Sequence, residues 1–149
     1  MLVESRETLR TLLDEFLLIF QLALKDHNIE FKIKVTKHFP KEIYFDTERY
    51  LEILFHLIMN SIKFKKQEDP KIHVRIRCKP IEGPANDTNG WVSRVTTEVS
   101  DNGIGIEKEQ QATLLYTFKA KKKGAVQGIG IGLSTVRSVT EALGGTVRL

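Results

Sequence analysis

The sequence predicts an α/β fold: a two-layer sandwich in which a mixed β-sheet has three main helices on one face. Two observations predict it. Apolar residues recur at intervals of three and four in long stretches, which is typical of amphipathic helices. They alternate with polar residues in shorter stretches, which is typical of strands. The expected helices cover residues 7–25, 48–65 and 129–143.

The composition is that of one globular domain. The chain has 149 residues, of which 41% are hydrophobic and 28% charged, so it is large enough to bury a core and is not a disordered chain. Its single cysteine, Cys78, excludes an internal disulfide framework and a cysteine-based zinc cluster. No apolar stretch reaches the length of a membrane span and no signal peptide is evident, so we expect a cytoplasmic segment without membrane contact.

The first half of the chain is expected to contain a helix, two strands and a second helix. Residues 7–25 place their apolar side chains on one face, and the polar residues 26–28 end this helix. Residues 29–35 alternate as in a half-exposed strand, and residues 43–45 form a short strand. Asp46 or Thr47 then caps the helix of residues 48–65.

This second helix carries a narrow polar stripe. Spacings of three and four return to the same side of a helix, and the residues on this side are Arg49, Glu52, His56, Asn60 and Lys63. Such a stripe is usually only the solvated side of a helix, and its histidine is as often a surface residue as a functional one. His and Asn are neither strong helix formers nor needed for solubility, which makes the stripe a candidate site.

The second half of the chain is expected to form a strand pair, a short helix and the last main helix. Residues 71–78 alternate as a strand, residues 79–90 form a turn-rich hairpin connection, and residues 91–100 form the partner strand. Residues 107–115 form a short helix, and the basic residues 116–127 form a mobile lid. The helix of residues 129–143 ends at Gly144 and Gly145, and residues 146–149 begin a further strand.

Two glycine clusters, taken together with the polar stripe, predict a nucleotide site. Asp101 ends a β-branched run and is followed by Gly103 and Gly105, so its carboxylate suits a flat heterocycle with a hydrogen-bond donor edge. Residues 128–133 (GIGIGL) open a helical pattern, where backbone amides and the helix dipole favour an anion. Each cluster alone is a weak signal, because glycine pairs mark turns more often than ligand sites.

Three motifs in this order resemble the catalytic, ATP-binding domain of sensor histidine kinases. They are Asn60 within residues 54–64 (LFHLIMNSIKF), residues 101–106 (DNGIGI) and residues 128–133, and residues 114–118 (LLYTF) are similar to the family's phenylalanine box. The resemblance covers about residues 9–149 and includes the wider superfamily of gyrase, a heat-shock chaperone and mismatch-repair ATPases. It implies a Bergerat-type ATP-binding fold in a single domain, residues 1–149.

The resemblance also implies roles for individual residues. Asn60 would hold Mg²⁺ through its carbonyl oxygen, Lys63 would meet a phosphate, and Phe64 would close one side of the base or ribose pocket. Asp101 would accept a hydrogen bond from the adenine amino group. The other implied ATP-binding residues approach the base, wall the pocket, cradle the phosphates or cover them from the lid: Gly103, Gly105, Ile106, Lys121, Gly128, Ile129, Gly130, Ile131, Gly132 and Leu133.

ATP and Mg²⁺ are therefore the expected cofactors, and the expected reaction is transfer of the ATP γ-phosphoryl group to a histidine. His56 stands where most members carry Asn and where the hydrolase branches carry a water-activating Glu. We expect it to orient or deprotonate the attacking group, with Glu52 one turn earlier holding its imidazole. None of the four histidines is followed by the acidic residue and proline of the phosphoacceptor motif. The target histidine is expected in cis on another segment or in trans on another chain.

The resemblance also leads to expectations about the two ends of the chain and about its partners. Residues 1–6 are interpreted as the remnant of a linker from an upstream dimerisation and phosphoacceptor segment. The family's last strand pair would follow residue 146, so truncation is expected there, and an open sheet edge allows a homodimer. A response regulator is the expected downstream partner, and nucleic acid is not, because the basic residues are not interleaved with aromatics. We expect a cytoplasmic location, as the soluble part of a larger, membrane-associated sensor.

Two alternatives to the kinase remain from the sequence. One is a degenerate, kinase-like scaffold, with or without nucleotide, that regulates a partner by docking. The departure at His56, the short lid and the missing end favour it. The other is an ATP hydrolase that drives a conformational cycle, which the lack of Glu at position 56 disfavours.

Overall fold

The computed structural model describes residues 2–3, 6–36, 43–44, 46–81, 93–114 and 131–149. It divides into two compact units, and each unit consists of two separate stretches of the chain. The first unit contains Met1–Phe45 and Asp69–Asp101, and the second contains Asp46–Glu68 and Asn102–Leu149. The sequence carries no composition change at these boundaries, and it did not predict the division.

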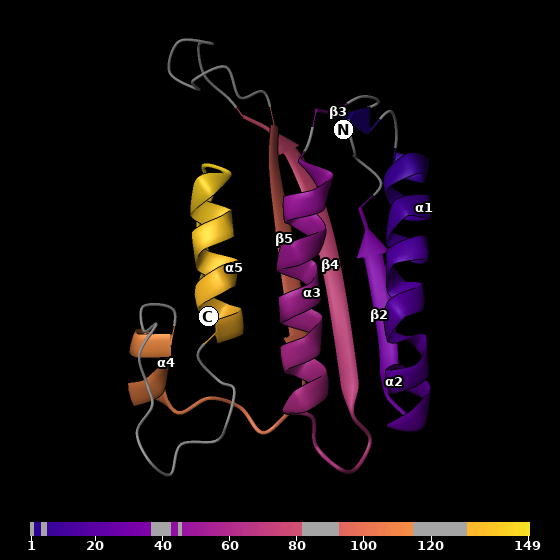
Figure 1. The fold of residues 1–149 in the computed structure, drawn as a ribbon, viewed down its shortest axis with the longest axis vertical. Coiled ribbons are helices and arrows are strands. Elements are labelled where there is room, and N and C mark those ends of the chain that lie inside the picture. Colours follow the sequence, from indigo (N-terminus) through magenta and orange to yellow (C-terminus); the bar gives the residue numbers. More distant parts are fainter. Residues whose placement is uncertain (1, 4–5, 37–42, 45, 82–92, 115–130) are drawn as a thin grey trace. The chain divides into compact units, whose positions relative to one another are not determined.

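A mixed three-stranded sheet forms the centre of the first unit (Figure 1). Its strands are β2 (Glu30–Val35), β4 (Lys71–Pro80) and β5 (Ser93–Asp101), in the order β2-β4-β5. β2 runs parallel to β4, and β5 runs antiparallel to β4. The buried side chains of β4 are those at every second position: Ile72, Val74, Ile76 and Cys78. The predicted α/β class with a mixed sheet is therefore confirmed.

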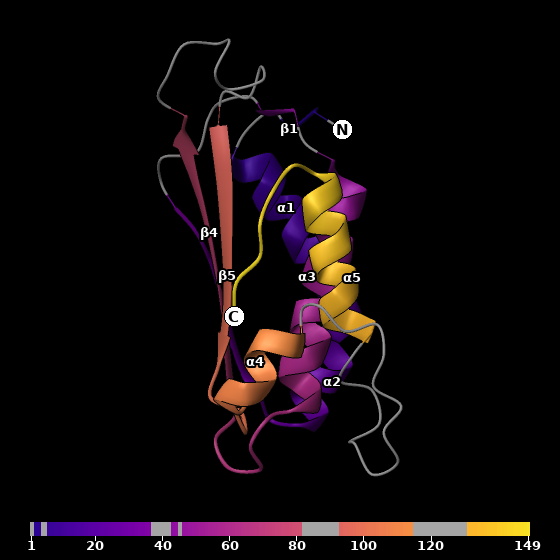
Figure 2. The same cartoon turned by 90° about the vertical axis from the view of Figure 1, so that its left-hand side faces the viewer.

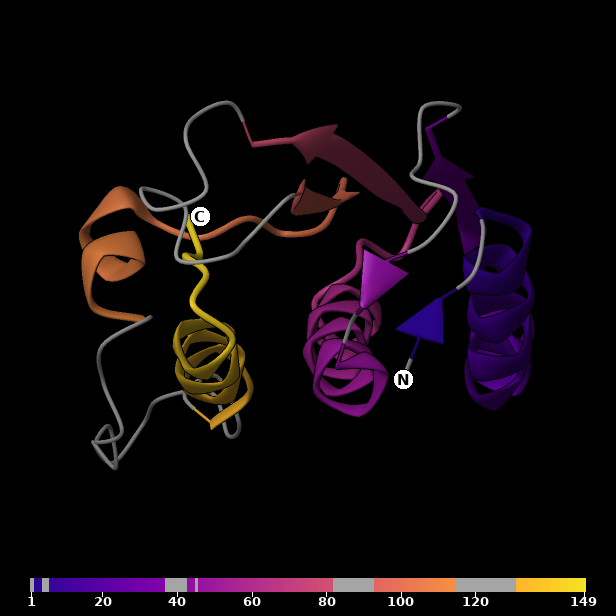
Figure 3. The same ribbon diagram turned by 90° about the horizontal axis from the view of Figure 1, so that it is seen from above.

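The predicted helix of residues 7–25 is interrupted. It consists of α1 (Arg6–Leu17), a 3₁₀ turn (Leu18–Phe20) and α2 (Gln21–Asp26), which lie along one face of the sheet on the side of β2 (Figures 2 and 3). Leu9, Leu13 and Phe20 are buried in this unit. The tighter turn shifts the helix phase, and Leu18, Ile19 and Leu22 become exposed. Asn28, with a φ of 51°, ends the helical segment as expected.

A second, smaller sheet also belongs to the first unit. β1 (Leu2–Val3) pairs antiparallel with β3 (Ile43–Tyr44), in the register Leu2 to Tyr44 and Val3 to Ile43. The short strand at residues 43–44 was predicted, but its partner was not, because residues 1–6 were interpreted as a linker remnant. Two residues are too few to show a period.

The described residues of the second unit form the helices α3 (Thr47–Lys63), α4 (Lys108–Leu114) and α5 (Ile131–Ala142). Asp46 caps α3 by accepting a hydrogen bond from the backbone N–H of Arg49 at 3.1 Å. α3 and α5 lie side by side and run in opposite directions (Figures 1 and 3). α5 ends at Ala142, and Gly144, with a φ of 74°, lies just beyond it. The N–H of Gly144 donates to Glu141 O and the N–H of Gly145 donates to Thr140 O, and these two bonds close the helix.

The expected strand at residues 146–149 does not form. These residues follow α5 without strand hydrogen bonding, because a four-residue stretch becomes a strand only where a neighbouring strand supplies partners. No helix in the part of the chain that the structure describes is long and apolar enough to cross a membrane.

Candidate functional site

The polar stripe of α3 meets the first turn of α5. A Cβ atom placed on Gly132 would lie 3.4 Å from both Nδ2 and Oδ1 of Asn60 and 3.7 Å from Nδ1 of His56. Spacing of four residues puts His56 and Asn60 on the same side of α3, and both are half-buried. The structure thus brings together three predicted site residues from two motifs that lie about seventy residues apart in the chain.

The glycine at position 132 places no side chain of its own against the Asn60 carboxamide. A Cβ at 3.4 Å would be in ordinary van der Waals contact with the amide, and any longer side chain would extend over it. A half-buried amide can offer its carbonyl oxygen to a hard cation, and the backbone of α5's first turn can approach an anion beside it. These residues therefore fit a Mg²⁺–phosphate group.

The end of α3 is joined to the first glycine cluster by a backbone hydrogen bond. Phe64 caps α3, with its N–H bonded to Asn60 O at 2.9 Å, and its own carbonyl accepts a hydrogen bond from Ile104 N at 3.0 Å. The Lys63 ammonium lies 5.4 Å from the centre of the Phe64 ring, in cation–π contact. The loop of residues 102–106 is thus held beside the C-terminal end of α3.

This loop exposes apolar side chains and is fixed at two points. Ile104 is 71% exposed and Ile106 is 39% exposed. Gln111 of α4 donates from Nε2 to the carbonyl of Ile106 at 2.8 Å. Gly105 has a φ of +77°, and a Cβ on it would meet nothing within 4 Å, so glycine is required there for backbone conformation rather than for space. Exposed isoleucines on a fixed loop suit the face of a planar base.

Asp101 is the last residue of β5, in the first unit. Its backbone faces Ile72 across the strand pair, and its side chain is exposed. The structure therefore agrees with its predicted position at the end of a strand. Its contact with adenine remains a prediction.

The remaining predicted residues have different outcomes. The His56 and Phe55 rings pack edge-to-face, with their centroids 5.6 Å apart. No hydrogen bond or ion pair joins Glu52 to His56 in the described ranges. Leu133 is buried at 7% exposure. Ile131 opens α5, but its side chain lies outside the described residues, as do the lid of residues 116–127 and residues 115–118 of the phenylalanine-box motif. Lys121, Gly128, Ile129 and Gly130 also lie outside them.

Sequence reasoning missed three residues of this region. Gln111 anchors the glycine loop, and Ser61 and Ser134 are buried polar residues directly after Asn60 and Leu133. The only sequence signal for the two serines was their position beside a motif residue. Both serines lie in the helix pair that carries Asn60 and Gly132, and a buried hydroxyl is normally hydrogen-bonded.

A family model matches most of the chain. The family is described as histidine kinase-, DNA gyrase B-, and HSP90-like ATPase, and it matches residues 45–149. Sensory/regulatory protein RpfC of Xanthomonas campestris pv. campestris is 26% identical over 143 residues, which are 94% of this chain and 19% of RpfC. Two-component system protein A of Emericella nidulans is 32% identical over 122 residues, which are 80% of this chain and 17% of that protein. The chain thus spans less than a fifth of these curated relatives' length.

Two solved histidine kinase structures share this fold. The catalytic domain of histidine kinase ThkA, in a nucleotide-free form, superposes with a TM-score of 0.68 at 21% identity and covers 96% of this chain and 82% of that domain. Full-length ShkA in complex with AMPPNP gives a TM-score of 0.65 at 24% identity and covers 91% of this chain and 25% of ShkA. At these identities the likeness shows the fold.

Proposed function

Because the chain belongs to the family of histidine kinase-, DNA gyrase B- and HSP90-like ATPases, we propose that it binds Mg²⁺–ATP with the three motifs and transfers the γ-phosphoryl group to a histidine. It is the ATP-binding catalytic domain of a sensor histidine kinase. The observation that carries the residue assignment is the approach of Gly132 to Asn60 and His56.

The reaction exchanges one bond to phosphorus for another. A ring nitrogen of the acceptor histidine attacks the γ-phosphorus with its lone pair, the P–O bond to the β-phosphate breaks, and the bonding electrons leave with ADP. Such a reaction depends mainly on holding the two groups in line and on stabilising negative charge. The acceptor histidine belongs to another segment or chain, since the four histidines here lack the phosphoacceptor motif.

Each described residue has a distinct part in this proposal. Asp101 accepts a hydrogen bond from the adenine amino group, and Ile104 and Ile106 contact the base. Asn60 holds Mg²⁺, which neutralises charge on the phosphate oxygens. The backbone of α5 at Gly132 approaches the phosphates. Lys63 reaches a phosphate by leaving the Phe64 ring, over which it lies in the structure.

The role of Asp101 can be tested by nucleotide binding. Asp101→Asn is expected to weaken binding of Mg²⁺–AMPPNP by about tenfold to hundredfold, because a hydrogen bond to a charged group contributes roughly 1.5–3 kcal/mol. Isothermal titration calorimetry measures the change. Asp26→Asn, at an exposed carboxylate of α2, is the matched control and should bind like the wild type.

The outcomes separate the kinase from its alternatives. A folded wild-type chain that fails to bind AMPPNP would favour a scaffold. Binding followed by phosphate release, without acid-labile labelling of histidine in the full-length protein, would favour a hydrolase. Labelling of histidine from γ-labelled ATP supports the transfer reaction.

His56 and Glu52 are proposed as a pair in which the carboxylate positions the imidazole for the transfer reaction. The residues are one helical turn apart on the same side of α3, so Glu52 can hold the imidazole of His56 in one orientation. Glu52→Gln should therefore alter the pH dependence of the transfer rate, and His56→Asn should lower the rate itself. If Glu52→Gln leaves the profile unchanged, Glu52 has no part in positioning His56.

A further inference from the structure

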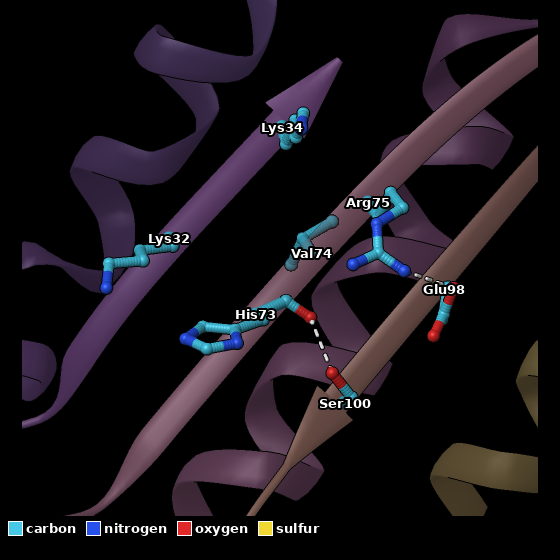
Figure 4. A pocket seen from close by; sticks show the side chains of 7 residues that line it. All are labelled: Lys32, Lys34, His73, Val74, Arg75, Glu98 and Ser100. Atoms are coloured by element: carbon cyan, nitrogen blue, oxygen red, sulfur yellow. Dashed lines mark hydrogen bonds and ion pairs between the residues drawn. The ribbon is translucent and has the colours of Figure 1, made fainter. Parts of the chain in front are cut away.

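The outward face of the three-stranded sheet carries an unusual excess of positive charge. Alternate residues of β2, β4 and β5 point away from the buried positions of the first unit. Those with ionisable side chains form what we call the cationic face: Glu30, Lys32, Lys34, Lys71, His73, Arg75, Arg77, Lys79, Arg94 and Glu98. Figure 4 shows several of them from this side of the sheet.

The charge of this face exceeds that of the whole chain. Seven Lys or Arg against two Glu give the face a net charge of +5, with His73 neutral, whereas the complete chain has +4. The solvated face of a sheet usually intersperses both signs. None of the residues proposed to bind nucleotide belongs to the face, so its charge is not explained by ATP.

The two glutamates already bind several of these cations. Glu98 accepts hydrogen bonds from Arg75 Nη1 at 3.2 Å and from Arg77 Nη2 at 3.3 Å. Glu30 contacts Lys32, Lys71 and His73, and the hydrogen bond from Lys32 lowers the pKa of the Glu30 carboxyl below its usual range. The cations of this face are thus spaced so that one carboxylate can contact two or three of them.

Other cations of the face lack such a partner. Lys34, Lys79 and Arg94 make no ion pair in the part of the chain that the structure describes. Two of the register pairs bring like charges opposite each other, Lys34 with Arg75 and Lys79 with Arg94. Like charges directly opposite one another are unfavourable. An added carboxylate between them would remove this repulsion.

A shallow hollow on the face could receive one such group. It has a volume of about 200 Å³ and lies among Lys32, Lys34, His73, Val74, Arg75, Glu98 and Ser100 (Figure 4). Pockets for drug-sized ligands measure about 300–1,000 Å³, so this hollow is too small for a nucleotide and suits a single acidic side chain.

The composition of the face favours an acidic protein segment over other polyanions. Its outward positions hold no Phe, Tyr or Trp on which bases could stack and no aliphatic side chain that could insert into a membrane. The β4 residues His73, Arg75, Arg77 and Lys79 repeat every second residue, about 6.8 Å apart. An extended segment with a carboxylate at every second residue has the same repeat.

We propose that the cationic face binds an extended acidic segment of a partner protein, with carboxylates placed along β4 and in the hollow. The binding is electrostatic, so it weakens with salt and is expected to be fast rather than tight.

The probe is a fluorescent peptide of alternating Glu and Ser, about as long as the ten residues of β4, with binding followed by anisotropy at low salt. Lys34→Glu/Arg94→Glu removes two cations that have no ion pair within the described ranges, so no described anion loses its partner. It is expected to weaken binding at least about tenfold. Lys25→Glu/Lys66→Glu makes the same change in net charge at exposed positions elsewhere and should change binding less than about threefold.

A gain-of-binding variant completes the test. Thr96 faces Arg77 on the outward side, and Thr96→Lys should tighten binding. Equal losses in the two double variants would overturn the proposal, because they would show an effect of net charge alone. Tighter binding of a DNA duplex or of phosphatidylserine vesicles than of the peptide, with the same dependence on Lys34 and Arg94, would also overturn it. Unchanged AMPPNP binding by Lys34→Glu/Arg94→Glu shows that the variant is folded and separates this test from that of the nucleotide site.

Discussion

Asn60→Ala is expected to lower the rate of Mg²⁺-dependent phosphotransfer by about a hundredfold or more, because charge stabilisation by a bound metal is worth several kcal/mol. The substitution removes the carboxamide that lies against Gly132 in the first turn of α5. The comparison is best made on single-turnover rates over a range of Mg²⁺ concentrations.

Two controls make this result specific to metal binding. Gln67→Ala removes an exposed amide in the same unit and should transfer phosphate like the wild type. Binding of ADP in the presence of EDTA should differ by less than about threefold between Asn60→Ala and the wild type, since no metal contact is then lost. Phosphotransfer that stays near the wild-type rate in Asn60→Ala would remove Asn60 from the metal site.

Substitution of Gly132 is expected to separate activity from stability. Gly132→Ala should weaken Mg²⁺–AMPPNP binding moderately. Gly132→Leu should weaken it by about a hundredfold, because the longer side chain covers the Asn60 amide and blocks a metal contact that contributes several kcal/mol to the binding free energy. Both replacements are better helix formers than glycine, by up to about 1 kcal/mol, so neither should lose helix α5. Calorimetry gives the affinity and urea unfolding gives the stability.

Ser138→Leu provides the matched comparison, because it adds the same side chain on an exposed position of the same helix. It should bind AMPPNP like the wild type. Wild-type affinity in Gly132→Leu would contradict the assignment of this contact to the phosphate site.

The local structure followed closely from residue type. Asp46, one of the two predicted caps, does cap α3, and helices end at residues 26–28 and before Gly144 and Gly145 as predicted. The left-handed conformation of Asn28 was found only in the structure. The strand pair β4–β5 was predicted from alternation before a turn-rich connection and a β-branched run after it, and the structure gives its register. Predictions of this kind depend only on neighbours in sequence.

Features that depend on distant partners could not be predicted in the same way. Helical spacing continues through residues 17–20, so the 3₁₀ turn at Leu18–Phe20 has no signal in the pattern. The strand at Leu2–Val3 exists only through its pairing with Ile43–Tyr44. The expected strand at 146–149 had the right residue types but pairs with no strand that the structure describes.

In the candidate site, too, local features were predicted from the sequence and contacts between distant segments were not. The stripe on α3 was visible from spacing, and the order of the motifs pointed to a shared site, but only the structure shows Gly132 against Asn60 and His56. The cation–π contact of Lys63 and the hydrogen bond by which Gln111 holds the glycine loop depend on side-chain geometry, which no residue pattern predicts.

The division of the chain into two interleaved units has a consequence for synthesis on the ribosome. The first unit is interrupted after Phe45 by the segment that contains α3, and it is complete only when Asp101 has emerged. The second unit is completed later in synthesis, because α5 packs against α3, which is synthesised about seventy residues earlier. Because their segments alternate along the chain, neither unit can be cut out as one continuous piece. The reading frame that encodes either unit also encodes a segment of the other.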